Sequence, residues 1–262
     1  MGKARLKRAG AAALALSVTL AGLAVAETIQ ERGLRITVHS QIQPYKLPRT
    51  GTAPIAVFVA GALKNPQGGI PPQLKQLTVR VNRHGLLQSR GLPACGVGQV
   101  QPSSTERALR VCSEALIGSG RFWAHIVLPG QEPYPTQGRL LVFNARQKGK
   151  PALLAHIYSR DPFNASFTIA FAIRKIRKGP YGTQLRASFP RALGEWGYVD
   201  RIKLTLRRKY THRGRALSYF NAGCPAPAGT RRTNYPLARV SFDFAARGSV
   251  ATTVSKACGV AG

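Results

Sequence analysis

Residues 77–82 of the chain read Leu-Thr-Val-Arg-Val-Asn, an alternation of apolar and polar side chains that is typical of a β-strand with one buried face. The same period of two, with polar or small residues at the alternate positions, recurs at residues 167–173, 202–206 and 240–244. Successive side chains of a strand point to opposite faces of the sheet. These stretches therefore predict sheets with one apolar and one hydrated face.

Other runs predict further strands and extend this pattern along the chain. They lie at residues 35–43, 54–63, 122–128, 139–145, 152–158, 184–189, 216–221 and 249–255. Clusters of Gly and Pro separate many of them, and the chain shows no internal repeat and no alternation of strands with helices. We therefore predict an all-β fold, a single antiparallel β-sandwich domain over residues 27–262, with N-terminal strands within residues 35–63.

One short helix interrupts the strands. Ser103 and Glu106 have the spacing of a capping box, and Gly118 is placed to end the helix. The apolar side of this segment consists of Ala108, Leu109, Cys112, Ala115 and Leu116.

The first 26 residues have the pattern of a secretory signal peptide. Four cations in residues 3–8 precede an apolar stretch at residues 9–23, and Ala-Val-Ala at residues 24–26 forms a cleavage site before Glu27. The stretch is too short and too rich in alanine for a membrane anchor, the alternative interpretation. We expect a secreted protein, extracellular or associated with the cell wall, with no transmembrane segment after cleavage of residues 1–26.

Export determines how the four cysteines are interpreted. An even number of cysteines in an oxidising compartment favours disulfides, and three pairings are open. Short loops are the easiest to close, so we favour the sequential pairs Cys95 with Cys112 and Cys224 with Cys258. A zinc site with four thiolates is the alternative, but the sequence contains no CxxC pair.

The chain is strongly basic, with 39 Lys and Arg against 9 Asp and Glu, and a net charge of +30. Removal of the signal peptide leaves 35 cations and the same nine acids, a net charge of +26. A hydrophobic content of 44% excludes a disordered basic tail. Such a charge on a folded protein indicates polyanionic partners.

The cations cluster near two predicted strands and their following turns. One cluster is Arg174, Lys175, Arg177 and Lys178, and the other is Arg201, Lys203, Arg207, Arg208, Lys209, Arg213 and Arg215. Arg201, Lys203 and Arg207 alternate with apolar residues and predict a cationic stripe on a hydrated sheet face. An arginine-rich surface that serves only solubility is the alternative interpretation.

Outside the cell, the expected partners of such a surface are anionic cell-wall polymers or acidic polysaccharides. Arg side chains bind the phosphate or carboxylate groups of such polymers through paired hydrogen bonds. Nucleic acid is a further, non-specific partner, because the sequence contains neither a recognition helix nor an aromatic RNA-binding motif. We therefore predict a non-catalytic structural or binding module of the cell envelope.

Known catalytic signatures, phosphate-binding loops and dinucleotide-binding motifs are absent from the sequence. The five histidines show no metal-ligand spacing; they are His39, His84, His125, His156 and His212. We therefore predict no catalytic residue, no metal site and no cofactor.

A loop at residues 194–200 provides the one alternative to a binding module. It contains Glu195, Trp196, Tyr198 and Asp200. Carboxylates beside aromatic rings can seat a sugar over a glycosidic bond, so the alternative is an extracellular carbohydrate-active enzyme with Glu195 and Asp200 as its catalytic pair. We favour the simpler interpretation, in which the two acids form ion pairs with nearby arginines such as Arg191 and Arg201.

Several short motifs resemble a family of secreted proteins from soil actinobacteria that has no assigned activity. They are LPR at residues 47–49, APIAVFVAG at 53–61, PPQL at 71–74, GLPAC at 91–95, IGSG at 117–120 and SYFNAGCPAP at 218–227. The resemblance covers most of the mature chain. It implies export, a β-rich fold and paired cysteines, and it supplies no catalytic residues.

Overall fold

The alternation of apolar and polar residues forms strands over most of the chain. The computed structural model describes residues 26–189, 197–245 and 247–261. Strands make up 63% of the structure and helices 7%, so the predicted β-rich class is confirmed. The predicted signal peptide lies outside the described residues except for Ala26, which begins the first strand.

The strands overlap every predicted stretch, although residues 127–128 and 189 lie outside them and the stretches 54–63 and 216–221 each divide between two strands. The structure also contains several short strands that the sequence did not indicate. The full set of strands is β1 (Ala26–Glu31), β2 (Leu34–Gln43), β3 (Lys46–Leu47), β4 (Ala53–Pro54), β5 (Ala56–Lys64), β6 (Leu74–Asn82), β7 (Gly85–Leu87), β8 (Leu116–Ile126), β9 (Tyr134–Gln147), β10 (Lys150–Ser159), β11 (Ala165–Lys175), β12 (Tyr181–Ser188), β13 (Gly197–Leu206), β14 (Lys209–His212), β15 (Arg215–Ser218), β16 (Phe220–Ala222), β17 (Arg232–Phe244) and β18 (Gly248–Val260). The helical segments are α1 (Val97–Val100), α2 (Thr105–Cys112) and the 3-10 turn η1 (Ser113–Ala115).

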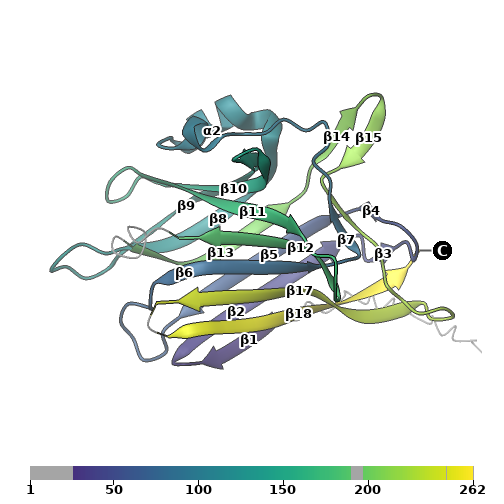
Figure 1. The fold of residues 1–262 in the computed structure, drawn as a ribbon. Coiled ribbons are helices and arrows are strands. Elements are labelled where there is room, and N and C mark those ends of the chain that lie inside the picture. The colour runs from purple at the N-terminus through teal and green to yellow at the C-terminus, as the bar shows by residue number, and fades with distance from the viewer. Residues whose placement is uncertain (1–25, 190–196, 246, 262) are drawn as a thin grey trace, which may run out of the picture.

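A single continuous sheet contains 13 of these strands (Figure 1). Its order is β1-β2-β5-β13-β8-β9-β10-β11-β12-β6-β17-β18-β3. Neighbouring strands are antiparallel except at one edge, where the short β3 pairs in parallel with β18. Two smaller sheets, β4-β16-β7 and the hairpin β14-β15, lie beside it.

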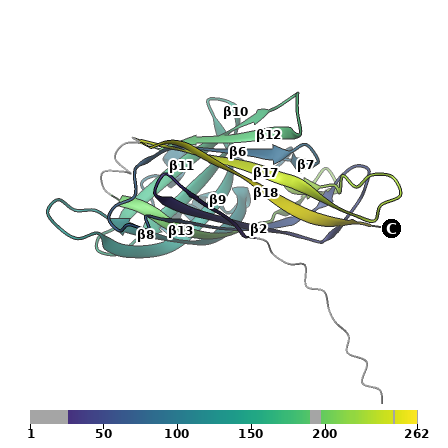
Figure 2. The same cartoon turned by 90° about the horizontal axis from the view of Figure 1, so that it is seen from below.

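The large sheet curls so that β2, near one edge, packs against β17 and β18, near the other. Figure 2 shows β12, β6 and β17 in one layer and β8, β13 and β2 in the other. Between the ends lies an apolar cluster with Leu34 and Ile36 of β2, Val240 of β17, and Val250 and Val254 of β18. The predicted sandwich of separate sheets is thus replaced by two layers of one sheet. Strand twist accumulates across a sheet of this width, which therefore curls.

Glycines on the inner side of the curl let neighbouring strands approach closely. A Cβ atom at Gly120 of β8 would lie 1.9 Å from the backbone oxygen of Lys203 on β13. A Cβ atom at Gly138 of β9 would lie 2.2 Å from the backbone oxygen of Tyr158 on β10. No side chain fits at either position, so glycine is required where the sheet bends.

The predicted helix forms, with a different first residue. Ser104, rather than Ser103, is the N-cap of α2, and its hydroxyl accepts a hydrogen bond from the backbone N–H of Arg107 at 3.3 Å. Ser103 is buried, and its backbone oxygen accepts a hydrogen bond from Nε2 of His156 at 3.0 Å. Either of two consecutive serines can cap a helix. Here Ser104 is the cap, while the backbone of Ser103 binds buried His156.

The end of the helix also differs from the prediction. α2 ends at Cys112, η1 follows it, and Gly118 lies within β8. A Cβ atom at Gly118 would lie 2.7 Å from the backbone oxygen of Thr205. This glycine therefore allows close strand packing and does not terminate the helix.

The helices cover part of the outer side of the sheet. Val100 of α1 and Ala108 of α2 pack against Leu141 and Phe143 of β9 and Leu154 of β10. The strands β9 and β10 are therefore buried on both faces where the helices lie, which explains the unbroken run of buried residues near the end of β9.

The two predicted disulfides are confirmed. Cys95 pairs with Cys112 and fixes the end of α2 to a segment whose backbone N–H binds the oxygen of Asn144 at 2.9 Å. Cys224 pairs with Cys258 and fixes the segment after β16 to β18. In the chain-entropy account such bridges contribute about 3 to 4 kcal/mol each. Their presence fits an oxidising compartment.

The close approach at Gly120 can be tested by adding a single methyl group. Gly120→Ala forces β8 away from β13, and we expect a loss of about 1 to 3 kcal/mol in the free energy of unfolding. Gly98→Ala is the matched control, because no atom lies within 4 Å of its added Cβ. Urea unfolding measures both variants. A Gly120→Ala variant as stable as the Gly98→Ala control would show that the sheet tolerates a side chain at residue 120.

Buried His156 makes the fold sensitive to acid. Burial lowers the pKa of its imidazole, and the hydrogen bond to Ser103 opposes this only in part. Below pH 6.5 the unfolded chain binds a proton at this position more readily than the folded protein, so stability is lost as the pH falls through this value.

We expect His156→Gln, which keeps an N–H donor for Ser103, to flatten the loss of stability between about pH 7 and about pH 5. Urea unfolding across this range measures the effect, and His84→Gln is the control. If the stability of His156→Gln falls with acid as steeply as that of the native protein, groups other than His156 cause the acid sensitivity.

Candidate functional site

The predicted binding cations divide among several parts of the surface. Arg201 and Lys203 lie on β13, and Arg174 and Lys175 end β11. Three strands separate β13 from β11 in the sheet. The other predicted cations lie after β11, after β13 and on the β14-β15 hairpin; they are Arg177, Lys178, Arg207, Arg208, Lys209, Arg213 and Arg215.

Arg208 differs from the others in this set because it is half-buried. Its Nη2 atom donates a hydrogen bond to the backbone oxygen of Glu114 at 3.0 Å. This arginine therefore holds the segment after β13 against η1, and the structure gives it a role in packing. The remaining ten predicted cations are exposed.

Pairing of the strands places three cations side by side on the outer face of the sheet. Lys203 of β13 is the cross-strand partner of Arg121 on β8, and Arg121 is the partner of Arg139 on β9. Ile202 and Leu204 point to the opposite, apolar side, where they pack against Phe122 and Leu140. Directly opposed residues of this kind lie about 5 Å apart, and like charges at that separation repel.

An aromatic ring lies beside this row. Trp123 of β8 is the cross-strand partner of Arg201 on β13. The guanidinium carbon of Arg201 lies 4.6 Å from the centroid of the Trp123 ring, and that of Arg121 lies 5.7 Å from it. Nη2 of Arg121 also donates a hydrogen bond to Oε1 of Gln137 at 3.2 Å. Cation–π contacts of this type hold the arginines in place without neutralising their charge.

We call this set of side chains the Trp123 surface; it consists of Arg121, Trp123, Arg139, Arg201 and Lys203. A shallow hollow adjoins it on the outer side of β5, β13 and β8. The small residues Ala60 and Ser119 are among those that line the hollow, together with His39 and Phe58. The four cations of the Trp123 surface are exposed, and the indole is half-buried.

Carboxylates do not compensate these cations in the described part of the chain. The ion pairs found there join Arg32 to Glu31 and Arg160 to Glu106, and the Asp200 carboxylate lies beside the His125 ring. None of them involves a residue of the Trp123 surface. Its positive charge is therefore available to a ligand.

Asp200 lies near this surface, in an environment that differs from the predicted one. It belongs to β13 rather than to a loop, at an irregularity in the pairing of β13 with β8. Its Oδ2 atom lies 3.7 Å from Nδ1 of His125, and the ring of Tyr198 stacks on His125 at a centroid distance of 5.0 Å. Burial raises the pKa of the Tyr198 phenol, and the Asp200 carboxylate raises it further. The observed partner of Asp200 is thus His125 and not Arg201.

Other residues of the alternative catalytic loop lie outside the part of the chain that the structure describes. They are Glu195 and Trp196, and Arg191, a predicted ion-pair partner of the acids, lies outside it as well.

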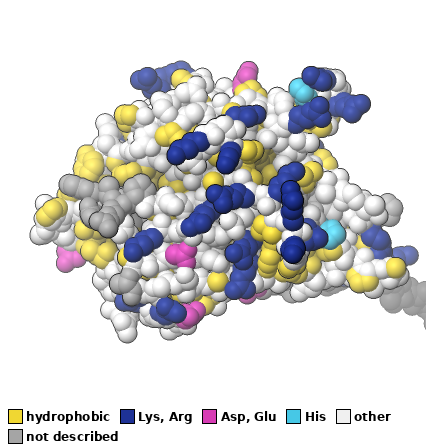
Figure 3. Space-filling view, viewed as in Figure 1, with side chains coloured by type: hydrophobic (Ala, Val, Ile, Leu, Met, Phe, Trp, Pro, Cys, Tyr) yellow, Lys and Arg dark blue, Asp and Glu magenta, His cyan; other side chains and the backbone are white. Residues whose placement is uncertain are grey.

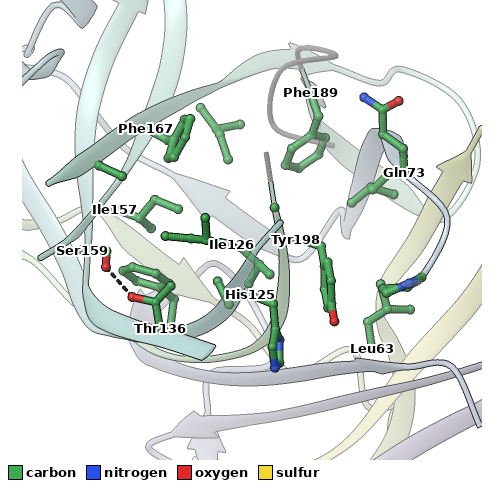
Figure 4. Close-up of a pocket in the computed structure, with 18 of the residues that line it drawn as sticks. Leu63, Gln73, His125, Ile126, Thr136, Ile157, Ser159, Phe167, Phe189 and Tyr198 are labelled. Atoms are coloured by element: carbon green, nitrogen blue, oxygen red, sulfur yellow. Dashed lines mark hydrogen bonds between the residues drawn. The ribbon is translucent and has the colours of Figure 1, made fainter. Parts of the chain in front are cut away.

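An apolar cavity lies on the inner side of the sheet, next to Tyr198 and His125 (Figure 4). Ile126, Ile157 and Phe167 line it, together with Phe189 at its edge. Its buried polar groups include the hydroxyls of Thr136 and Ser159, which form a hydrogen bond with each other. No carboxylate belongs to the described lining of this cavity.

Sequence reasoning identified Arg201 and Lys203 but missed Arg121, Trp123 and Arg139. Arg121 is the single Lys or Arg of β8, and Arg139 is seven residues from Arg146, the other cation of β9, so neither forms a cluster along the chain. Only the strand order and register show that they adjoin Lys203. Alternation along residues 122–128 and 139–145 indicated the strands, yet it carried no information about their neighbours.

Comparison of the chain with protein-family models, curated proteins and solved structures found no significant match. The resemblance to secreted actinobacterial proteins therefore stays a prediction. Among residues 26–189, 197–245 and 247–261, no helix is long and apolar enough to cross a membrane. The same residues contain no group of three or more His, Cys, Asp or Glu side chains that could hold a metal ion.

Proposed function

We propose that this is a secreted, non-catalytic β-rich protein that binds anionic polymers of the cell envelope through the Trp123 surface. The observation that carries the proposal is the row of Lys203, Arg121 and Arg139 in directly opposed positions on three neighbouring strands. No carboxylate among the described residues forms an ion pair with any of them. A polyanion laid across the row would supply the missing negative charge.

The arrangement has an energetic cost that such a ligand removes. Opposed like charges destabilise a sheet by several tenths of a kcal/mol up to about 1 kcal/mol per pair. Bound phosphate or carboxylate groups convert this repulsion into attraction and release counterions to the solvent. The same cations that weaken the free protein therefore favour the complex.

The shape of the site fits an elongated chain better than an enclosed small molecule. The cations stand on the outer face of the sheet and are exposed. Arg121 and Arg201 are held by the Trp123 ring, so less conformational entropy is lost when they bind an anion. Cell-wall polymers and acidic polysaccharides are long chains with regularly spaced negative groups, and the row presents cations at regular spacing across the strands.

The alternative of a carbohydrate-active enzyme gains no support from the described residues. It requires two carboxylates that face each other across a sugar-binding groove. Asp200 pairs with His125, and the cavity beside Tyr198 is lined by apolar groups. We therefore favour binding over catalysis. Nucleic acid offers the same phosphate chemistry and remains a non-specific partner in this proposal.

Removal of the positive charges of Arg121, Arg139 and Lys203 tests the proposal. We expect the triple variant R121Q/R139Q/K203Q to bind poly(glycerol phosphate) or hyaluronate about 30-fold more weakly at low salt, since exposed charge pairs contribute up to about 1 kcal/mol each. The dependence of log K on log salt should also become shallower by about 2 to 3 units. Titration monitored by tryptophan fluorescence at several salt concentrations measures both effects.

The control variant R90Q/K148Q/R231Q removes the same charge from exposed positions elsewhere. It should bind nearly as tightly as the native protein if the Trp123 surface is the site. An equal loss of affinity in the control would show that only net charge matters. Binding that does not weaken as salt rises would refute the electrostatic account altogether.

A further inference from the structure

A second group of arginines lies on the outer face of four other strands. Figure 3 shows Lys and Arg side chains spread across the face that contains β11, β12, β6 and β17. We call four of them the Arg80 surface; they are Arg80 of β6, Arg174 of β11, Arg186 of β12 and Arg239 of β17. All four are exposed. Three of them, Arg80, Arg186 and Arg239, do not belong to the cation clusters that the sequence indicated.

Strand register brings these arginines together. Arg80 is the cross-strand partner of Arg239, and on its other side Arg80 pairs with Gln184, which pairs with Arg174. Arg186 lies two residues along β12 from Gln184, so its side chain shares this face. The cross-strand partners of Arg186 are the small residues Ala172 and Thr78. The four arginines therefore gather on one outer face of these strands.

Neutral amides orient these arginines. Nε of Arg80 donates a hydrogen bond to Oε1 of Gln184 at 3.3 Å, and Nε of Arg186 donates one to Oε1 of Gln76 at 2.6 Å. An amide partner fixes the side chain but leaves its full positive charge. In both cases the terminal nitrogens remain on the exposed end of the side chain, where they can bind a phosphate or carboxylate group in a bidentate manner.

The nearest carboxylate on this face is already bound. Asp243 of β17 accepts a hydrogen bond from Nε2 of Gln76 at 2.7 Å, and its other oxygen binds the Ser249 hydroxyl. Asp243 forms no ion pair within 4.0 Å of a cation among the described residues. The Arg80 surface therefore resembles the Trp123 surface, since both present unpaired cations in adjacent positions of a sheet.

The two surfaces point in opposite directions. The strands β12, β6 and β17 form one layer of the curled sheet and β8 and β13 the other (Figure 2). Apolar side chains fill the space between the layers, where Leu185 of β12 and Leu204 of β13 pack against the same buried cluster. Arg186 and Lys203 alternate with these leucines, so they face outward on the two sides of the molecule.

We propose that the protein cross-links anionic polymers, with one chain bound at the Trp123 surface and a second at the Arg80 surface. This inference rests on the proposed function and adds a second site for the same class of ligand, polymers that carry phosphate or carboxylate groups. Each surface alone binds one chain. Because the sites lie back to back, the folded protein joins two chains without a need to form a dimer.

A capture experiment tests the proposal. Hyaluronate is attached to a sensor, the protein is added, and fluorescent hyaluronate is then supplied as the second chain. We expect the native protein to capture the second chain. The variants R80Q/R239Q and R121Q/K203Q should each still bind a soluble hyaluronate oligosaccharide but lose at least about tenfold in captured fluorescence, because each retains one surface.

Controls separate this inference from the proposed function. R90Q/K148Q loses the same charge outside both surfaces and should capture the second chain like the native protein. Native protein that binds the sensor but captures no second chain would disprove cross-linking and leave the proposed function standing. Absence of any binding to the sensor would overturn both.

The number of bound oligosaccharides gives an independent readout. Isothermal titration should show two short chains per native protein and one per variant of either surface. Analytical ultracentrifugation shows whether the protein is a monomer under these conditions. Capture that persists in both surface variants would mean that cross-linking arises from self-association, and it would overturn the assignment of the two surfaces.

Discussion

The structure depends on the burial of one apolar face by a sheet that has no second sheet to cover it. A strand with alternating side chains gains stability only when its apolar side leaves water. Here the sheet meets this requirement by curling until β2 packs against β17 and β18 across the cluster of Leu34, Ile36 and Val240. Gly120 and Gly138 provide the close strand approach that the bend requires. The helices and the smaller sheets then cover what the curl leaves exposed. One disulfide secures the end of α2, and the other secures the segment after β16.

The curl also determines how charge is distributed. Since the inner face is apolar, nearly all polar side chains of the long strands must lie on the outside, and a strongly basic chain places its cations there. Cross-strand register then decides which of them meet. It brings Lys203, Arg121 and Arg139 together on one side and Arg80 and Arg239 on the other. The nine acids are too few to separate these cations, so the outside of the sheet has two positive regions.

Local pattern in the sequence was sufficient for most of the longer strands, the β-rich class and the cysteine pairs, because each depends on residues that are near one another in the chain. It was insufficient for the curl, which depends on where two inward-facing glycines meet backbone oxygens of neighbouring strands; for Gly120 that strand, β13, is distant in the sequence. The helix cap was misplaced by one residue because Ser103 and Ser104 are adjacent and equally suitable. The candidate site was half-predicted: Arg201 and Lys203 belong to a visible cluster, whereas Arg121 adjoins them only through the pairing of β8 with β13.

In the proposed complex, fold stability and polyanion binding depend on the same unpaired cations. Repulsion within each surface lowers the stability of the free protein, and dissolved salt screens that repulsion. The same salt competes with a polyanion for the arginines and weakens the complex. Salt therefore acts in opposite directions on the free and bound protein. Cations that served only solubility would gain nothing from adjacent positions, since dispersal over the outer face would keep the charge and avoid the repulsion. Their adjacency on both sides of the sheet therefore favours the proposed anionic ligand, which would bridge neighbouring strands.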